Sequence, residues 1–233
     1  TGVGHRDFNV NFDPNLPVEE DLMRRDFTIN AMAMSLSDRA VVDPLGGQQD
    51  LADRTLRMTS ERSFEEDPLR MLRAVQFAAR FEFQIEPQTF AAMKRHASLI
   101  TSVSAERIAE ELNKLLTLAD RPSIGFRLMQ QAGLLREIIP EFDLCVGVDQ
   151  PGPFHAFDVF EHTLHVIDAA PPSLQIRLAA LFHDIRKPQA KRPTPDNRAT
   201  VYGHEVTGAR TAVDVLRRLR YPHDLTHDVA VLV

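Results

Sequence analysis

The feature that most constrains this 233-residue chain is a helical repeat of apolar residues that runs almost unbroken from Glu65 to the end. Prolines stand where the first turn of a helix tolerates them, as at Pro87 and Pro122, and Gly133 suits a helix stop. We therefore predict a mostly α-helical fold. The predicted helices span residues 67–81, 87–98, 104–118, 122–132, 157–170, 174–186, 203–220 and 223–233.

The residues before Glu65 mix strand and helix patterns, which is typical of the end of an α/β unit. Phe8, Val10 and Phe12 alternate with polar residues as in a short strand. The later predicted elements are a helix from Leu22 to Ser35, a short strand at 41–42, and a polar stretch over 48–60 with a short helix.

Composition limits the class of protein. The net charge of −6 excludes an overall basic field, although arginines are bunched at 70–80, 186–198 and 210–220, which leaves a local basic track possible. Cys145 is the only cysteine, so no intrachain disulfide can form, and a reducing cytoplasm is favoured. No apolar run approaches the length of a membrane span. The best linker candidate is 147–152, and Lys187 to Arg198 is predicted to be an exposed loop.

The stretch around Asp67 carries the first functional signal. Asp67 suits a helix N-cap and Pro68 suits the first turn. Arg70 follows three residues later, so the carboxylate and the guanidinium can meet at the helix start. Together they offer one acceptor edge and one donor edge, which would accept cytosine or adenine and refuse uracil or guanine. On this stretch alone, a capped helix with an ordinary ion pair is the favoured interpretation, since such helices are common.

A second stretch begins with two adjacent arginines, Arg24 and Arg25, whose guanidinium groups can clamp phosphates. Asn30 lies four residues after Asp26, so its amide could hold that carboxylate or bind a ribose hydroxyl.

Four motifs then occur in one order: R-R-D-F-T-I-N-A (24–31), D-P-L-G-G-Q-Q-D-L (43–51), E-D-P-L-R-M-L-R-A (66–74) and E-R-I-A-E-E-L (106–112). In this order they resemble the motifs of the bacterial tRNA nucleotidyltransferases, the CCA-adding enzymes, and their poly(A) polymerase relatives. The resemblance implies the end of a nucleotidyltransferase head domain over 1–62, a helical nucleotide-reading and RNA-binding neck over 63–148, and an HD domain over 149–233.

The resemblance also implies roles for individual residues. Asp67 and Arg70 match the pair that reads the incoming CTP or ATP, and Glu66 matches the residue that orients this pair. Arg25, Asp26 and Asn30 match a motif that contacts the nucleotide's sugar and phosphates, and we add Arg73, which shares a helix face with Arg70. Asp43 with Gly46–Gly47 matches a hinge between head and neck, and Glu106–Arg107 matches a brace for the reading helix.

One family motif has no counterpart in residues 1–20. It is the Gly-Gly loop with the Asp-x-Asp carboxylates that hold Mg²⁺, which we expect upstream of Thr1, so the sequence is interpreted as a fragment. Asp7 and Asp13 are lone carboxylates. Because nucleotidyl transfer needs these ions, the 233-residue chain by itself is expected to bind a nucleotide weakly without polymerising.

The second half carries a histidine-rich constellation. His183-Asp184 lies in an apolar helical stretch and is flanked by His155, His162, His165 and His204. This resembles the HD superfamily of metal-dependent phosphohydrolases, and it implies His162, His183, Asp184 and, more weakly, His204 as ligands of a divalent transition metal. Arg186 stands where that motif usually has glycine, and a last carboxylate ligand would be Asp228 or a residue beyond Val233.

The sequence thus predicts template-independent addition of C and A to the 3′ end of tRNA. Two alternatives remain open: HD phosphohydrolysis as the working activity, and a non-catalytic RNA-binding module. The motifs equally fit CC-adding, A-adding and poly(A)-adding variants.

Overall fold

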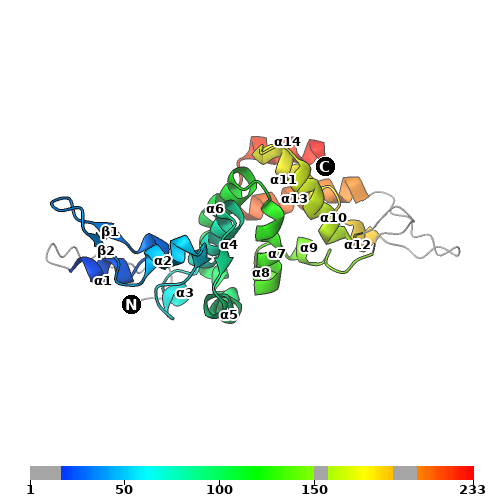
Figure 1. Ribbon diagram of the computed structural model, residues 1–233. Coiled ribbons are helices and arrows are strands. Elements are labelled where there is room, and N and C mark those ends of the chain that lie inside the picture. The colour runs from blue at the N-terminus through cyan, green and yellow to red at the C-terminus, as the bar shows by residue number, and fades with distance from the viewer. Residues whose placement is uncertain (1–16, 150–156, 191–203) are drawn as a thin grey trace.

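The computed structural model describes residues 17–149, 157–190 and 204–233 of the chain. Figure 1 shows an elongated arrangement, with the short strands and α1–α3 at one end, α4–α8 in the middle and α10–α14 at the other end. The described chain is mostly helical with small two-stranded sheets, so the predicted fold class is confirmed. The strand predicted at Phe8–Phe12 lies outside the described residues.

The N-terminal end consists of short elements. In order these are α1 (Val18–Met23), the 3₁₀ turn η2 (Thr28–Asn30), β1 (Ala33–Met34), β2 (Val41–Val42), α2 (Gly47–Ala52) and β3 (Thr55–Leu56). β1 and β2 pair antiparallel, with Ala33 opposite Val42. β3 instead pairs in parallel with β4 (Gln84–Ile85), with Leu56 opposite Ile85, and this ties the N-terminal end to the helical middle. The strand at Val41–Val42 and the short helix within 48–60 are as predicted.

The predicted helix from Leu22 to Ser35 is wrong. α1 ends at Met23, and Phe27 adopts an extended conformation with φ −129° and ψ 153°. There Phe27 is fully buried and forms a β-bridge with Met58, while the Thr28 N–H donates to the carbonyl of Arg57 at 3.0 Å. Pairing with a distant segment has therefore outweighed the local helical pattern.

The middle of the molecule follows the predicted helices closely. Its elements are α3 (Ser63–Glu66), α4 (Leu69–Phe81), α5 (Pro87–His96), η3 (Ala97–Ser102), α6 (Ala105–Leu118), α7 (Pro122–Ala132), α8 (Leu134–Ile138) and α9 (Pro140–Asp143). α4 lies against both α6 and α7. Gly125 permits the close approach of α7, because a Cβ there would lie 2.5 Å from a Leu115 methyl carbon of α6.

The C-terminal end is built from α10 (Val159–Ala169), α11 (Leu174–Phe182), α12 (Lys187–Ala190), α13 (His204–Arg218) and α14 (His223–Leu232). The loop predicted from Lys187 is wrong over its first residues, which form α12; residues 191–203 lie outside the described part. None of the helices in the described part of the chain combines the length and apolar character that crossing a bilayer requires.

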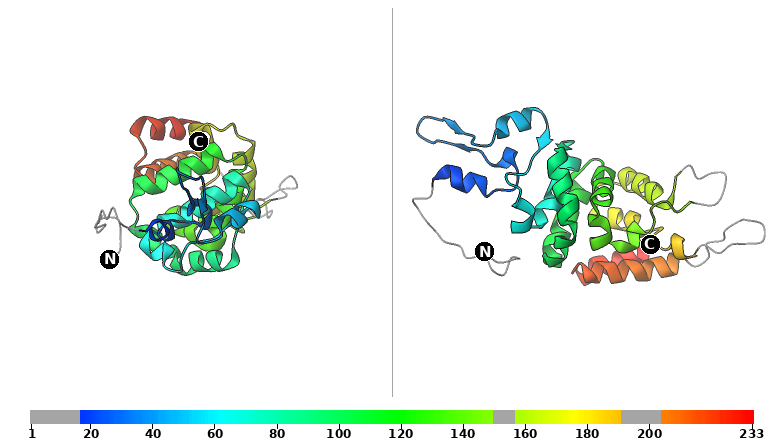
Figure 2. Two further views of the ribbon diagram at one scale, coloured as in Figure 1. Left: turned by 60° about the vertical axis from the view of Figure 1, so that its left-hand side comes forward. Right: turned by 90° about the horizontal axis from the view of Figure 1, so that it is seen from below.

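One hydrophobic core continues from the middle into the C-terminal end. The rings of Phe126 (α7) and Phe142 (α9) lie 5.8 Å apart, and Phe142 lies 4.9 Å from Phe160 (α10). The buried Arg177 of α11 donates to the carbonyls of Leu116 and Ala119 at the end of α6, at 2.6 and 2.8 Å. These contacts hold α10 and α11 firmly against the middle helices, and the views in Figure 2 show the same close packing.

Candidate functional site

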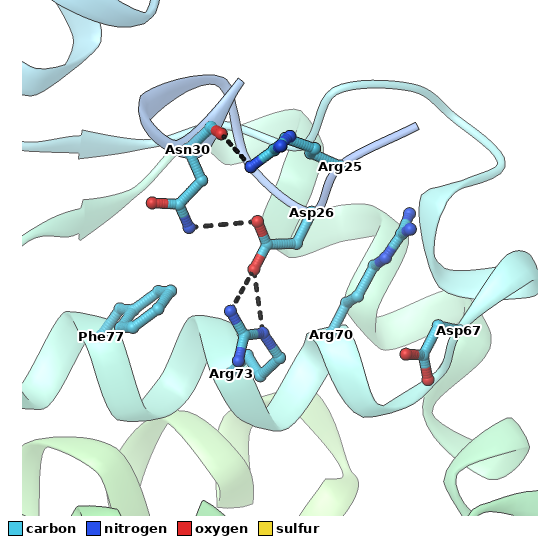
Figure 3. Close-up of a pocket in the computed structure, with 7 residues that line it drawn as sticks. All are labelled: Arg25, Asp26, Asn30, Asp67, Arg70, Arg73 and Phe77. Carbon is cyan, nitrogen blue, oxygen red and sulfur yellow. Dashed lines mark hydrogen bonds and ion pairs between the residues drawn. The ribbon is translucent and has the colours of Figure 1, made fainter. Parts of the chain in front are cut away.

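A pocket of about 470 Å³ lies where the N-terminal end meets α4 (Figure 3). The segment that follows α1 forms one wall, and the N-terminal end and exposed face of α4 form the other. Its lining residues are Arg25, Asp26, Asn30, Asp67, Arg70, Arg73 and Phe77. All the predicted nucleotide-binding residues except Glu66 thus line one pocket, although they come from two segments far apart in the sequence.

Asp26 is the centre of one wall. Its Oδ2 accepts hydrogen bonds from Arg73 Nε and Nη2 at 2.9 and 2.7 Å, and its Oδ1 accepts from the Asn30 amide at 3.1 Å (Figure 3). Asp26 is 8% exposed, so this charge is nearly buried and depends on Arg73 for compensation. The predicted Asn30–Asp26 contact is confirmed, and the Asp26–Arg73 pair links the N-terminal end to α4.

Glu111 of α6 lies on the other side of Arg73, 3.8 Å from its Nη1. Its side chain is nearly buried and its Oε1 also accepts from Lys114 at 2.8 Å. The sequence analysis missed Glu111. The available signal was its place in α6 beside Ile108, Leu112 and Leu115, because a carboxylate in an apolar stripe needs a buried cationic partner.

Asp67 and Arg70 flank the N-terminal end of α4, where the Arg70 N–H donates to the Asp67 carbonyl at 3.0 Å. Within the described residues no hydrogen bond or ion pair joins their side chains. Asp67 Oδ2 accepts from Arg107 of α6 at 2.8 Å, and its Oδ1 accepts from the Leu69 N–H at 3.2 Å. α4 therefore begins at Leu69 rather than at residue 67, with the Asp67 side chain satisfying one of its first N–H groups. The Arg107 contact agrees with the predicted bracing role; Glu106 is exposed.

Arg70 finds its partners in the chain before α4. Its guanidinium donates to the Arg24 carbonyl at 2.6 Å and to Ser63 Oγ at 3.0 Å, and Glu66 lies 3.6 Å away. The predicted meeting of Asp67 and Arg70 side chains is therefore replaced by contacts with nearer partners. The two side chains still face the same pocket from neighbouring positions (Figure 3).

The predicted hinge residues form a capped turn. Asp43 accepts from the Gly47 and Gln48 N–H groups at 2.6 and 3.0 Å, and the Gln48 N–H chiefly lowers the pKa of Asp43, against a smaller opposing effect of burial. A Cβ on Gly47 would collide with the Thr28 carbonyl, so only glycine allows α2 to pack on η2. A hinge role stays a prediction.

A second constellation lies between α10 and the end of α11. His183 Nε2 lies 3.3 Å from His162 Nε2 and 3.1 Å from Asp184 Oδ2, and His162 Nε2 lies 3.5 Å from the same oxygen. These are the predicted ligand residues, and within the described ranges they form a group able to hold a metal ion. The side chain of His204, at the start of α13, and residue His155 lie outside the described part. Asp228 is exposed on α14 and is not in the group.

Lys187 adds a cation to this group, with Nζ 2.7 Å from Asp184 Oδ2. Burial alone would raise the pKa of Asp184, but hydrogen bonds from His183 and Lys187 outweigh it and lower the pKa to about 2. Burial would lower the pKa of His183, and the contact with Asp184 overcomes this and raises it. The contacts with His183 and Lys187 thus favour the ionised form of the Asp184 carboxylate.

Comparison with known proteins agrees with this geometry. Two family models match this chain. The model described as the poly A polymerase head domain matches residues 5–57, and the model described as the probable RNA and SrmB-binding site of polymerase A matches residues 82–145. Curated relatives include multifunctional CCA proteins of Ralstonia nicotianae, 41% identical, and Actinobacillus pleuropneumoniae, 39% identical; each match covers 100% of this chain. The chain spans 56% and 58% of the length of those relatives.

Solved structures give the same result. The Bacillus stearothermophilus CCA-adding enzyme in complex with CTP matches with a TM-score of 0.65 and 27% identity, covering 92% of this chain and 46% of that one. The Thermotoga maritima CCA-adding enzyme complexed with tRNA, at 24% identity and a TM-score of 0.54 over 92% of this chain and 57% of that one, shares the fold. The fold and the ordered motifs are similar to those of nucleotidyltransferases. The chain belongs to the tRNA nucleotidyltransferase family.

Proposed function

We propose that this protein adds C and A nucleotides to the 3′ end of tRNA without a nucleic-acid template, using CTP and ATP. The observation that carries the proposal is the pocket at the start of α4, where Asp67 and Arg70 face the same space beside Asp26 and Asn30. The relatives of known name, including CCA-adding enzymes solved with CTP, support the same activity.

The chemistry of the pocket explains how C and A would be chosen. Cytosine and adenine both present an amino donor beside a ring-nitrogen acceptor, which match the Asp67 carboxylate and the Arg70 guanidinium. Arg70 would exchange the Arg24 carbonyl and Ser63 Oγ for the base edge, and Asp67 would remain fixed by Arg107. Arg25, Asp26 and Asn30 would then face the sugar and phosphates at the other wall.

Members of this family normally use a divalent metal, and Mg²⁺ belongs to the proposal. The described pocket residues do not fit that ion, because Asp26 is paired with Arg73 and Asp67 with Arg107. The Mg²⁺ ligands implied by the resemblance are the Asp-x-Asp carboxylates, which are not among the described residues. A cytoplasmic location is likewise proposed, from the single buried cysteine, Cys145.

The test uses protein expressed from the full gene. It is given tRNAs that end at the discriminator base or in C-C, with CTP, ATP or both, and product lengths are read on a gel. Addition of C-C-A followed by a stop supports the proposal. Addition of C-C only, of A only, or of a long A tail identifies one of the variants, and no addition refutes it. RNA binding that ignores nucleotides and Arg70→Ala indicates a non-catalytic binding module.

The cluster between α10 and α11 favours a second activity, metal-dependent phosphohydrolysis. Ligand atoms around one ion with bonds of about 2.0–2.1 Å lie roughly 3 Å apart, and the His162, His183 and Asp184 atoms lie 3.1–3.5 Å apart. These residues therefore fit a divalent transition metal that displaces Lys187 Nζ from Asp184 Oδ2, and we propose His204 as a fourth ligand. The metal would activate water against a phosphate ester such as a 2′,3′-cyclic phosphate. Loss of cyclic-phosphate hydrolysis in His183→Ala would support this activity.

A further inference from the structure

We propose that the exposed face of α4 beyond the base-reading residues binds the unpaired 3′-terminal nucleotides of an RNA acceptor, by stacking bases on Phe77 and Phe81. The proposal rests on the proposed function for the nature of the acceptor. It assigns a second nucleic-acid subsite to the part of α4 that follows the base-reading Arg70.

Five residues of α4 share this face: Arg70, Arg73, Phe77, Arg80 and Phe81. With 3.6 residues per turn they fall within an arc of about 100°. We call this face the Arg–Phe stripe. It combines arginines with aromatic rings, which is the side-chain combination that single-stranded nucleic acid binds.

The pocket is longer than one base. Its lining includes Arg70, Arg73 and Phe77 of α4, and the seven-residue step from Arg70 to Phe77 spans about 10 Å of helix. Successive stacked bases are about 3.4 Å apart. A base read by Asp67 and Arg70 therefore leaves the Phe77 end of the pocket open for a neighbouring base (Figure 3).

Aromatic rings continue from the pocket outward. The Phe77 ring lies 5.8 Å from Phe81, and Phe81 lies 6.0 Å from Phe83. Phe77 is anchored on its inner side by edge contact with the buried Phe27 at 6.0 Å. Phe81 is 42% exposed, so part of its side chain is accessible to a base. The row thus leads from a fixed ring in the pocket to an accessible ring at the end of α4.

Arginine side chains accompany these rings. Arg73 Cζ lies 5.2 Å from the Phe77 ring centre and Arg80 Cζ lies 4.8 Å from the Phe81 ring centre. Within the described residues no carboxylate pairs with the exposed Arg80, which leaves its charge available to a phosphate. Stacking is also suited to this acceptor, because its last base changes with each addition and every base has a π-face.

The test uses protein from the full gene and two fluorescent RNA hairpins, one with a two-nucleotide 3′ overhang and one blunt, without added nucleotide. The wild type is expected to prefer the overhang. Phe81→Ala should weaken overhang binding by about tenfold and leave blunt-hairpin and CTP affinities unchanged, whereas Phe81→Trp should retain the preference. Arg80→Ala should reduce the slope of log affinity against log salt by about one. The matched control is Phe157→Ala, which removes a 47% exposed ring far from the stripe.

Equal overhang binding by the wild type and Phe81→Ala would overturn the subsite. So would a wild type with no preference for the overhang, or a Phe81→Ala variant that melts lower and loses CTP and RNA binding together, which would mean that Phe81 serves packing. The two proposals fail separately. If the wild type adds C and A while Phe81→Ala behaves normally, only the subsite is wrong. If the overhang preference depends on Phe81 but nothing is added, only the proposed activity is wrong.

Discussion

The pocket on α4 and the cluster between α10 and α11 use the same kinds of side chain in opposite ways. In the pocket, each carboxylate is already paired with an arginine from another segment, as Asp26 is with Arg73 and Asp67 with Arg107. In the cluster, two imidazole nitrogens and one carboxylate oxygen lie 3.1–3.5 Å from one another, and that oxygen is also 2.7 Å from Lys187 Nζ.

This difference indicates the kind of ligand that each region suits. Fixed donors and acceptors spread over about 470 Å³ match a flat organic molecule with its own donor and acceptor edges. Three convergent ligand atoms match a point charge. The pocket on α4 and the His162–His183–Asp184 cluster should therefore respond differently to substitution, to added metal and to pH.

The largest expected effect is on metal binding. His183→Ala should lower the affinity for Ni²⁺ by more than about 100-fold, since removal of even an outer partner of a metal site costs 10–100-fold. The affinity is measured by isothermal titration calorimetry on protein from the full gene. His165→Ala serves as the control, because His165 is exposed on α10, the helix that carries His162, and stacks on Phe157 instead. Unchanged Ni²⁺ binding in His183→Ala would remove the contrast between the two regions.

The next effect is on base selection. Arg70→Ala should lower kcat/KM for both CTP and ATP by about 10- to 100-fold, because a bidentate contact to a base edge is worth about 1–3 kcal/mol. Arg70→Lys should fail nearly as badly, since an ammonium cannot present two parallel donors. Arg136→Ala is the control, being 67% exposed on α8. If Arg70→Ala instead weakened Ni²⁺ binding and left kcat/KM for CTP and ATP unchanged, the assignment of base selection to the pocket on α4 would be wrong.

A smaller effect concerns stability. Arg73→Met leaves the nearly buried Asp26 carboxylate without its cation and should lower the free energy of unfolding by about 1–3 kcal/mol. Urea denaturation followed by circular dichroism measures the change. Arg62→Met, which removes a 70% exposed guanidinium 3.9 Å from Glu65, should change it by less than about 0.5 kcal/mol. Equal effects would mean that the Asp26–Arg73 pair does not join the pocket walls.

The smallest effect is that of an arginine–carboxylate pair outside both regions. Burial would raise the pKa of Glu141, but the Arg218 guanidinium, 2.7 and 2.8 Å from its oxygens, outweighs burial and lowers it. The stabilisation is therefore present above the unfolded-state pKa and is lost as pH falls through the folded-state pKa. Wild type should exceed Glu141→Gln in stability at pH 7 by about 0.5 kcal/mol, and the difference should vanish in acid. Urea titrations at both pH values measure it.

Local sequence determined most of the helices. The α4 helix was predictable because Pro68 and the apolar spacing act within a few residues, and this spacing alone places Arg70, Arg73 and Phe77 on one face. The His183-Asp184 pair was visible for the same reason, since adjacent residues stay adjacent in any fold. The motifs also carried the family resemblance that relatives of known name support.

The tertiary structure decided which carboxylate pairs with which arginine. Asp67 is held by Arg107, 40 residues away, and Asp26 by Arg73, 47 residues away, and both contacts exist because α4 packs between α6 and the segment after α1. The same packing ended the predicted helix at Met23, since burying Phe27 and bridging it to the segment at Met58 stabilises more than continuing an exposed helix. Periodicity reports on neighbours within about one turn, whereas partners across a core depend on how whole elements pack.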